Sequence, residues 1–176
     1  MSKIGLLSDS HGRASTTRRA VQVLLERQVH RIVHLGDIGT VEVIDALVEN
    51  LDEAGRVKPP VHVVFGNTDW DAAALGRYAE GFGIQVDHPV GRLSVDDRVL
   101  VYQHGDRSAS MQQALAEEVD YLCHGHTHRT RDERRGRTRL VNPGALFRAS
   151  RYTVAVLDPG RDELEFLEVP AAGPAV

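Results

Sequence analysis

The 176-residue sequence predicts a single α/β domain in which two sheets pack face to face with helices outside them. In the first half, strand-like apolar runs alternate with segments of helical periodicity, a pattern typical of parallel α/β sheets. In the second half, strand-like runs are joined by short turns, which indicates hairpins. Together, the two halves predict a four-layer αββα sandwich built from two mixed sheets.

The first half contains three predicted strands separated by two predicted amphipathic helices. The strands are expected at residues 3–8, 31–35 and 61–65. The helices are expected at residues 13–28 and 41–54, with Gly55 as the C-terminal cap of the second. Because parallel sheets bind ligands at the carboxyl ends of their strands, the loops after these strands are expected to carry the site.

The second half contains three predicted hairpins, one short helix and one further strand. The hairpins are expected to pair residues 90–95 with 98–104, 130–135 with 137–142, and 152–158 with 163–169. The helix is expected at 109–118 and the strand at 120–124. Residues 1–168 are therefore predicted to form one domain, and residues 169–176 a disordered C-terminal tail.

Composition excludes several classes of protein. A net charge of -4 gives no global sign of nucleic-acid binding. Cys123 is the single cysteine, so a disulfide within the chain is impossible, and a reducing cytoplasm is the expected compartment. We interpret Cys123 as a small buried residue. The apolar runs are too short to span a membrane, so no membrane association is expected.

Polar side chains suited to metal binding cluster at the predicted strand ends. They are Asp9, His11, Asp37, Asn67, His104, His126 and His128. This mixed oxygen and nitrogen set is too large for one tetrahedral zinc ion and suits two cations that share a carboxylate. Two divalent cations against two carboxylates leave a formal surplus of about +2, which favours a bound phosphate. Manganese, iron, zinc, cobalt or nickel suit these ligands better than magnesium.

The motifs DSH (9–11), GD (36–37), GN (66–67), HG (104–105) and GHTH (125–128) resemble, in this order, those of the calcineurin-like metallophosphoesterases. The short length, the NPG at 142–144 and the YTVAVLD that follows it resemble the small bacterial phosphodiesterase branch. The resemblance runs from about residue 3 to residue 168. It implies a metal-dependent phosphoric ester hydrolase, more a phosphodiesterase than a monoesterase.

The resemblance also implies a role for each ligand. Asp9, His11 and His128 would hold the first metal, Asn67, His104 and His126 the second, and Asp37 would bridge them. A water or hydroxide between the metals would attack phosphorus in line, so Asp37, Asn67 and His104 are the expected catalytic residues. In an extended segment, residues two apart share a face, so we expect His126 and His128 both to point into the site.

Two positions depart from the family pattern. Thr68 stands where many members have a histidine thought to protonate the leaving group, and Asp106 stands where another histidine is frequent. Without a strong acid, diesters or aryl esters should react better than alkyl monoesters. Asp69 is expected either to orient a ligand histidine through a hydrogen bond or to be a solvated turn residue.

Some further residues have more than one interpretation. His124 is a satisfied strand histidine or, alternatively, a ligand or a proton or substrate contact. Arg148 or Arg151 is a possible phosphate contact. The six arginines at 129–139 indicate a solvated hairpin whose charges block edge pairing, or alternatively a rim for anionic substrates or nucleic acid. Interleaved aromatic residues are absent there, which argues against stacking on single strands.

Three alternative functions remain at this stage. One is a non-catalytic metal-binding scaffold of the same fold. Another is a nuclease or nucleotide polyphosphatase of the same superfamily. A nucleotide-binding α/β protein is disfavoured because neither a P-loop nor GxGxxG follows the first strand. The expected substrate is a small phosphodiester or nucleotide-like molecule, and nucleic acid is possible but not favoured as a partner. A homo-oligomer is possible.

Overall fold

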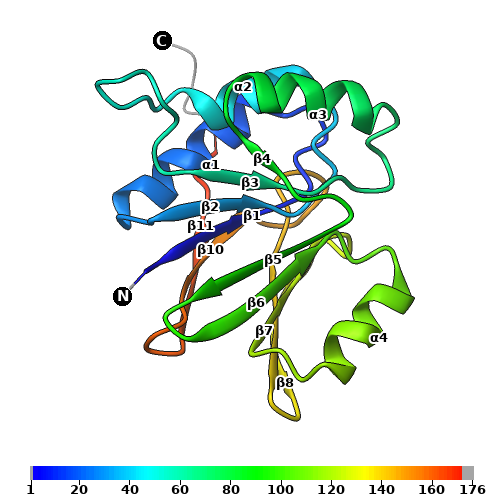
Figure 1. Cartoon of the computed structure of the whole chain (residues 1–176). Helices are drawn as coiled ribbons and strands as arrows, with labels where there is room; N and C mark the ends of the chain where they lie inside the picture. The colour runs from blue at the N-terminus through cyan, green and yellow to red at the C-terminus, as the bar shows by residue number, and fades with distance from the viewer. Residues whose placement is uncertain (1, 172–176) are drawn as a thin grey trace.

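The larger of two sheets has six strands in the order β11-β10-β1-β2-β3-β4 in the computed structural model, which describes residues 2–171 (Figure 1). Its strands are β1 (Ile4–Leu7), β2 (Arg31–His34), β3 (Val61–Val63), β4 (Gln85–Val86), β10 (Thr153–Asp158) and β11 (Glu163–Glu168). The strands β1 to β4 run parallel, whereas β10 and β11 are antiparallel to their neighbours. This sheet is therefore mixed, with its parallel part contributed by the first half of the chain.

The smaller sheet has five strands in the order β5-β6-β7-β9-β8. Its strands are β5 (Val90–Val95), β6 (Arg98–Gln103), β7 (Tyr121–Cys123), β8 (Thr130–Arg135) and β9 (Thr138–Pro143). The central strands β6, β7 and β9 are parallel, and the hairpin partners β5 and β8 are antiparallel at the two edges. All three predicted hairpins are confirmed.

Helices cover the outer face of each sheet and complete the four layers (Figure 1). The larger sheet packs against α1 (Ala14–Glu26), α2 (Val41–Val48) and α3 (Ala72–Gly81). The smaller sheet packs against α4 (Ser108–Ala116). The predicted αββα sandwich of two mixed sheets is thus confirmed.

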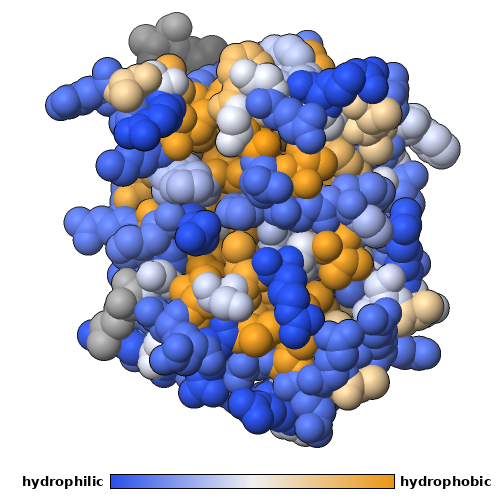
Figure 2. All heavy atoms as spheres, in the orientation of Figure 1, coloured by the Kyte–Doolittle hydropathy of each residue, from blue (hydrophilic) through white to orange (hydrophobic). Residues whose placement is uncertain are grey.

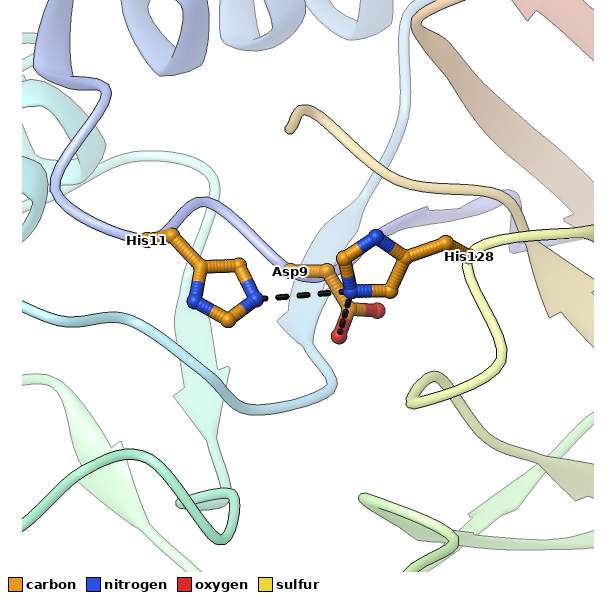
Figure 3. A group of neighbouring side chains, drawn as sticks. All are labelled: Asp9, His11 and His128. Atoms are coloured by element: carbon orange, nitrogen blue, oxygen red, sulfur yellow. Dashed lines mark hydrogen bonds and ion pairs between the residues drawn. The ribbon is translucent and has the colours of Figure 1, made fainter. Parts of the chain in front are cut away.

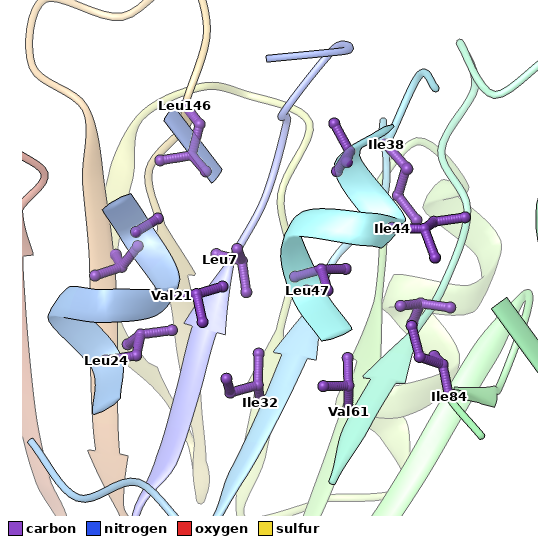
Figure 4. Packing of buried hydrophobic residues seen from close by; sticks show 14 of the residues in the cluster. Leu7, Val21, Leu24, Ile32, Ile38, Ile44, Leu47, Val61, Ile84 and Leu146 are labelled. Atoms are coloured by element: carbon purple, nitrogen blue, oxygen red, sulfur yellow. The ribbon is translucent and has the colours of Figure 1, made fainter. Parts of the chain in front are cut away.

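Side chains that alternate along β1 contribute to two hydrophobic cores, one between the two sheets and one between the larger sheet and its helices. Ile4 and Leu6 face the smaller sheet, whereas Leu7 faces the helices, because successive side chains of a strand point to opposite faces. Figure 4 shows Leu7 among side chains from α1, α2 and the neighbouring strands. Both faces of this sheet are buried, so its central strands are continuous apolar runs.

The helix expected at 41–54 ends earlier, at Val48. Asp52 explains the difference, because its Oδ1 accepts the amides of Ala54 and Arg56, each at 2.9 Å, in a local turn that competes with helix. Gly55 lies in this turn with φ +73°. The expectation that Gly55 caps a helix is therefore wrong.

The sequence analysis missed α3 and β4. The Asp71 carboxylate begins α3 by accepting the Ala74 amide at 3.0 Å. Leu75 and Ala79 face the core, but glycines within the segment and the exposed Trp70 before it obscure the pattern. β4 is two residues long, too short for a periodicity to be recognised.

The chain remains packed just past residue 168. Val169 is buried, and its amide donates to the Tyr152 carbonyl at 2.8 Å. The Pro170 carbonyl accepts a hydrogen bond from Arg19. Residues 172–176 of the expected tail lie outside the described residues. The chain is therefore held in place by hydrogen bonds as far as Pro170, and the expected tail beyond it stays a prediction.

Hydrophilic residues form most of the face drawn in Figure 2, and apolar side chains gather along its middle, where the layers meet.

Acidic residues within the arginine-rich hairpin pair with several of its arginines: Arg131 and Arg135 pair with Glu133, and Arg139 pairs with Asp132. These pairs favour the solvated-hairpin interpretation. Within residues 2–171, the helices are too short or too polar to cross a membrane.

The packing of α2 yields a stability prediction. Leu47 is 1% exposed in the core, whereas Leu51, just beyond the helix, is 58% exposed. Leu47→Ala should lower the free energy of unfolding by about 2–5 kcal/mol, because it leaves a cavity. Leu51→Ala, the matched control, should change it by less than about 0.5 kcal/mol. Urea denaturation measures both, and equal effects would contradict the described packing.

Candidate metal centre

The carboxyl ends of strands from both sheets meet at one edge of the sandwich, and all seven predicted ligands lie in the loops there. Hydrogen bonds join the loops of the two sheets at this edge. The His126 amide donates to Asp9 Oδ2 at 3.1 Å, and His104 Nδ1 lies 2.8 Å from the Leu35 carbonyl. The loops after β1 and β2 are joined by the His11 amide, which donates to the Asp37 carbonyl at 2.8 Å.

A first cluster joins Asp9 and His11 to His128, which is more than a hundred residues away in the sequence (Figure 3). His128 Nε2 lies 3.3 Å from Asp9 Oδ1 and 3.4 Å from His11 Nε2. The three side chains converge from two loops, and their ligand atoms all lie within 4.8 Å of one another. This group has the composition and spacing to hold a cation.

A second cluster contains Asp9, Asp37 and His104, whose ligand atoms also lie within 4.8 Å of one another. Asn67 Oδ1 lies 3.1 Å from His104 Nε2, so Asn67 adjoins this cluster. The His126 ring lies beside the His104 ring, with centroids 5.1 Å apart, but His126 does not belong to either tight group. The two clusters share Asp9.

Asp37 lies between the two predicted ligand sets. Its Oδ2 is 3.4 Å from His11 Nε2 and 3.5 Å from His104 Nε2, one histidine from each set. The Thr68 amide donates to its Oδ1 at 2.9 Å. Asp37 is thereby held so that one oxygen faces both sets.

Left-handed backbone conformations gather at this edge. Among the seven predicted ligands, Asp9, His11, Asp37, His126 and His128 have φ between +42° and +69°. Such values are uncommon for residues other than glycine and are maintained by the surrounding structure. The expectation that His126 and His128 alternate along an extended segment is wrong, because β7 ends at Cys123 and both histidines lie in a bent loop.

Two glycines allow the ligand loops to approach one another. A Cβ at Gly125 would lie 1.9 Å from Ser8 Oγ and 2.7 Å from Asp9 Oδ2. A Cβ at Gly66 would lie 2.1 Å from Asp37 Oδ1. Only a glycine fits at each position, which explains why the GN and GHTH motifs contain one.

Burial and hydrogen bonding shift the pKa values of the two carboxyls in opposite directions. Burial raises the pKa of Asp9 above its usual value. Burial also acts to raise the pKa of Asp37, but the contact with His104 and the hydrogen bond from Thr68 outweigh it, so the pKa lies well below its usual range. Burial acts to lower the pKa of His104, and the Asp37 carboxylate raises it overall.

The residues fit a bound cation. Asp9 is 0% exposed, and within residues 2–171 its Oδ1 has no hydrogen-bond partner although a histidine nitrogen lies 3.3 Å away. A buried carboxylate oxygen in this state is costly unless a cation lies against it. Imidazole nitrogens and carboxylate oxygens are the usual ligands of divalent transition metals.

The remaining predicted residues have other roles. Asp69 does not bond to a ligand histidine; its carboxylate accepts the amides of Ile38, Gly39 and Gly66, at 2.7–3.2 Å, and so joins two ligand loops. His124 is buried, lies 3.0 Å from the Gly125 carbonyl, and is outside both clusters. Arg148 is exposed near the His11 side of the site.

The sequence analysis missed some residues that support the site. The sequence analysis considered Thr68 only as a position that lacks a general acid. Its amide, however, donates to Asp37 Oδ1, and its hydroxyl lies 3.4 Å from His11 Nδ1. The Phe147 ring packs on the His11 ring with centroids 5.1 Å apart, and Arg13 lies over Phe147. No local pattern marks these contacts, because they join segments far apart in the sequence.

Comparisons with known proteins show the family of this chain. The family description "Calcineurin-like phosphoesterase superfamily domain" matches residues 2–162. Phosphodiesterase MJ0936 from Methanocaldococcus jannaschii is 24% identical over 166 residues, covering 92% of this chain and 95% of its own.

Solved structures share the fold. A novel archaeal phosphodiesterase has a TM-score of 0.82 at 22% identity, covering 94% of this chain and 99% of its own. The phosphoesterase YfcE from E. coli has a TM-score of 0.68 at 19% identity, covering 96% and 100%. Zinc-complexed Vps29 from Entamoeba histolytica has a TM-score of 0.60 at 18% identity, covering 96% and 99%. Because the family model covers residues 2–162, the chain belongs to the calcineurin-like phosphoesterase superfamily, which confirms the resemblance drawn from its motifs and identifies it as a metal-dependent phosphoesterase.

Proposed function

We propose that this chain is a phosphodiesterase that uses two divalent cations. The observation that carries the proposal is that two ligand clusters adjoin, with Asp37 Oδ2 lying 3.4 Å from His11 Nε2 and 3.5 Å from His104 Nε2. A site for a single cation needs only one cluster of ligands, so the second cluster favours a second cation. A relative of nearly the same length carries the name phosphodiesterase.

In this proposal, each cation has three ligands of its own and shares Asp37. Asp9, His11 and His128 hold one cation, and Asn67, His104 and His126 hold the other. The short distances within the first set and between Asn67 and His104 support the assignment. His126 is the least constrained of the seven, since only its ring contact with His104 supports it.

When bound, two such cations activate a water molecule and neutralise charge on the phosphoryl oxygens. The chain's own residues prepare the site for that chemistry. Asp37 stays ionised across the physiological pH range because its pKa is lowered. The Leu35 carbonyl, next to His104 Nδ1, orients the ring so that Nε2 faces Asn67 and Asp37. Asn67 and His126 are exposed, so substrate can approach from that side.

The identity of the metals and the compartment are finer parts of the proposal. The imidazole, amide and carboxylate ligands favour manganese, iron, zinc, cobalt or nickel, and manganese is our first choice for assay. The buried free thiol of Cys123 is compatible with a reducing cytoplasm.

Hydrolysis of bis-p-nitrophenyl phosphate tests the function. The protein is stripped with a chelator and given manganese, nickel, zinc or magnesium singly. Diester cleavage should return with at least one transition metal. Asn67→Ala and His104→Ala should each lower kcat/KM by about 100-fold or more, because each removes a proposed ligand.

Matched controls are Asn50→Ala and His30→Ala, which remove the same side chains at positions away from the site. Both should retain the full rate.

Cleavage that persists in the site variants would refute the proposed ligands. Binding of two ions without turnover of any ester would favour the non-catalytic scaffold instead, since a zinc complex of Vps29 has the same fold. Cleavage of DNA or dinucleoside polyphosphates in preference to small diesters would favour the nuclease or polyphosphatase alternative.

Thr68 yields a prediction on substrate preference. A general acid contributes about 100-fold to 10⁴-fold, so its absence should penalise poor leaving groups. The kcat/KM for p-nitrophenyl phosphate should exceed that for ethyl phosphate by at least about 100-fold. Thr68→His should narrow this gap, whereas Thr68→Val, which retains the amide that holds Asp37, should leave it unchanged. Fastest turnover on alkyl monoesters by the unmodified protein would contradict this account.

A further inference from the structure

Two arginines lie against one aromatic ring at the His11 edge of the metal centre. The guanidinium carbon of Arg13 is 4.7 Å from the Phe147 ring centroid, and that of Arg148 is 5.1 Å from it. The same ring packs on His11, with centroids 5.1 Å apart. Phe147 therefore places two positive charges beside a proposed metal ligand. We call Arg13, Phe147 and Arg148 the arginine clamp.

Neither guanidinium of the arginine clamp has a carboxylate partner among residues 2–171. By contrast, Arg131, Arg135 and Arg139 in the basic hairpin all form ion pairs. Contact between an exposed guanidinium and one aromatic ring contributes only about 0.5–1 kcal/mol per cation, and the two like charges repel each other. Such a pair is better suited to binding an anion than to stabilising the fold.

The clamp is attached to the ligand loops from both sides. The Leu146 amide donates to the Ser8 carbonyl at 3.2 Å, and the Leu146 side chain is fully buried in the same core cluster as Leu7 and Val21 (Figure 4). The Arg13 amide donates to the Ser10 carbonyl at 2.8 Å. Arg148 has φ +46°, a conformation that the loop must maintain. The two guanidinium groups are thus presented by backbone that is fixed to the DSH loop.

The position of the clamp indicates which part of a substrate it would meet. The His11 ring packs directly on Phe147, and His11 Nε2 faces Asp37 and His128. Both guanidinium groups contact the ring that packs on His11, so they are linked to a proposed ligand of the scissile phosphate's site through a single aromatic side chain. Guanidinium groups bind phosphate oxygens through paired, charge-assisted hydrogen bonds.

We propose that Arg13 and Arg148 bind a second phosphate of the substrate, separate from the scissile one, with Phe147 holding the two guanidinium groups in place. This inference rests on the proposed function and narrows it. The preferred substrates become phosphodiesters that carry an additional terminal phosphate, such as esters of nucleoside bisphosphates. Simple diesters lack the group that the arginine clamp recognises.

Two chromogenic substrates that differ by one phosphate test the proposal. They are the p-nitrophenyl ester of thymidine 5′-phosphate and the same ester with a 3′-phosphate added. The unmodified protein should prefer the 3′-phosphorylated ester by about tenfold or more in kcat/KM, the effect of one charge-assisted contact. Arg13→Gln and Arg148→Gln should each reduce this preference, and the double variant should have a ratio of about 1.

Arg18→Gln is the matched control. It removes the same charge from the adjacent helix α1, where the Arg18 guanidinium pairs with Glu49. It should retain the preference and should cleave bis-p-nitrophenyl phosphate at the unmodified rate. Equal melting temperatures would exclude unfolding as the cause of any loss.

The outcomes separate this proposal from the one on which it rests. Cleavage of all diesters with no preference for the added phosphate, or a preference that survives in the double variant, would overturn the arginine clamp alone. Failure to cleave any diester would overturn the proposed function. In that case, calorimetry still tests the arginine clamp by comparing the Kd of thymidine 3′,5′-bisphosphate with that of thymidine 5′-phosphate. The bisphosphate should bind about tenfold more tightly, and only when both arginines are present.

Discussion

Two carboxylates, Asp9 and Asp37, are buried side by side where the two sheets meet, and the rest of the structure depends on accommodating them. Burying a carboxylate is costly unless hydrogen bonds or cations offset the loss of water. The chain supplies amides from His126 and Thr68 and imidazoles from surrounding loops. This arrangement requires both sheets to end at the same edge of the sandwich.

The same constraint explains which parts of the site were predictable. Asp9, Asp37 and Asn67 follow consecutive parallel strands, and the carboxyl ends of such strands meet, so their proximity could be inferred from the sequence. The bent loop that carries His126 and His128 could not be predicted, because its left-handed residues are maintained by contacts with the other sheet. For that loop, the predicted alternation gave the wrong backbone conformation, and the ligand roles of both histidines stay predictions.

Other features were missed because they depend on particular side-chain contacts, which hydrophobic periodicity does not reveal. The end of α2 is set by the Asp52 turn, a side-chain hydrogen bond that helical periodicity does not reveal. Asp69 joins two loops through backbone amides, which appear only once both loops are in place. Arg13 and Phe147 are more than a hundred residues apart, and only the fold brings them to one side of the metal centre. The site therefore has buried carboxylates at its base, an open side near Asn67, and positive charge at the His11 edge.

The most direct test of the central claim is anomalous X-ray diffraction from crystals grown with manganese. The account predicts two anomalous peaks at the sheet edge, both within bonding distance of Asp37. One peak should contact Asp9, His11 and His128, and the other Asn67, His104 and His126. A single peak at full occupancy, or two peaks without Asp37 between them, would contradict the proposal of two cations that share this carboxylate.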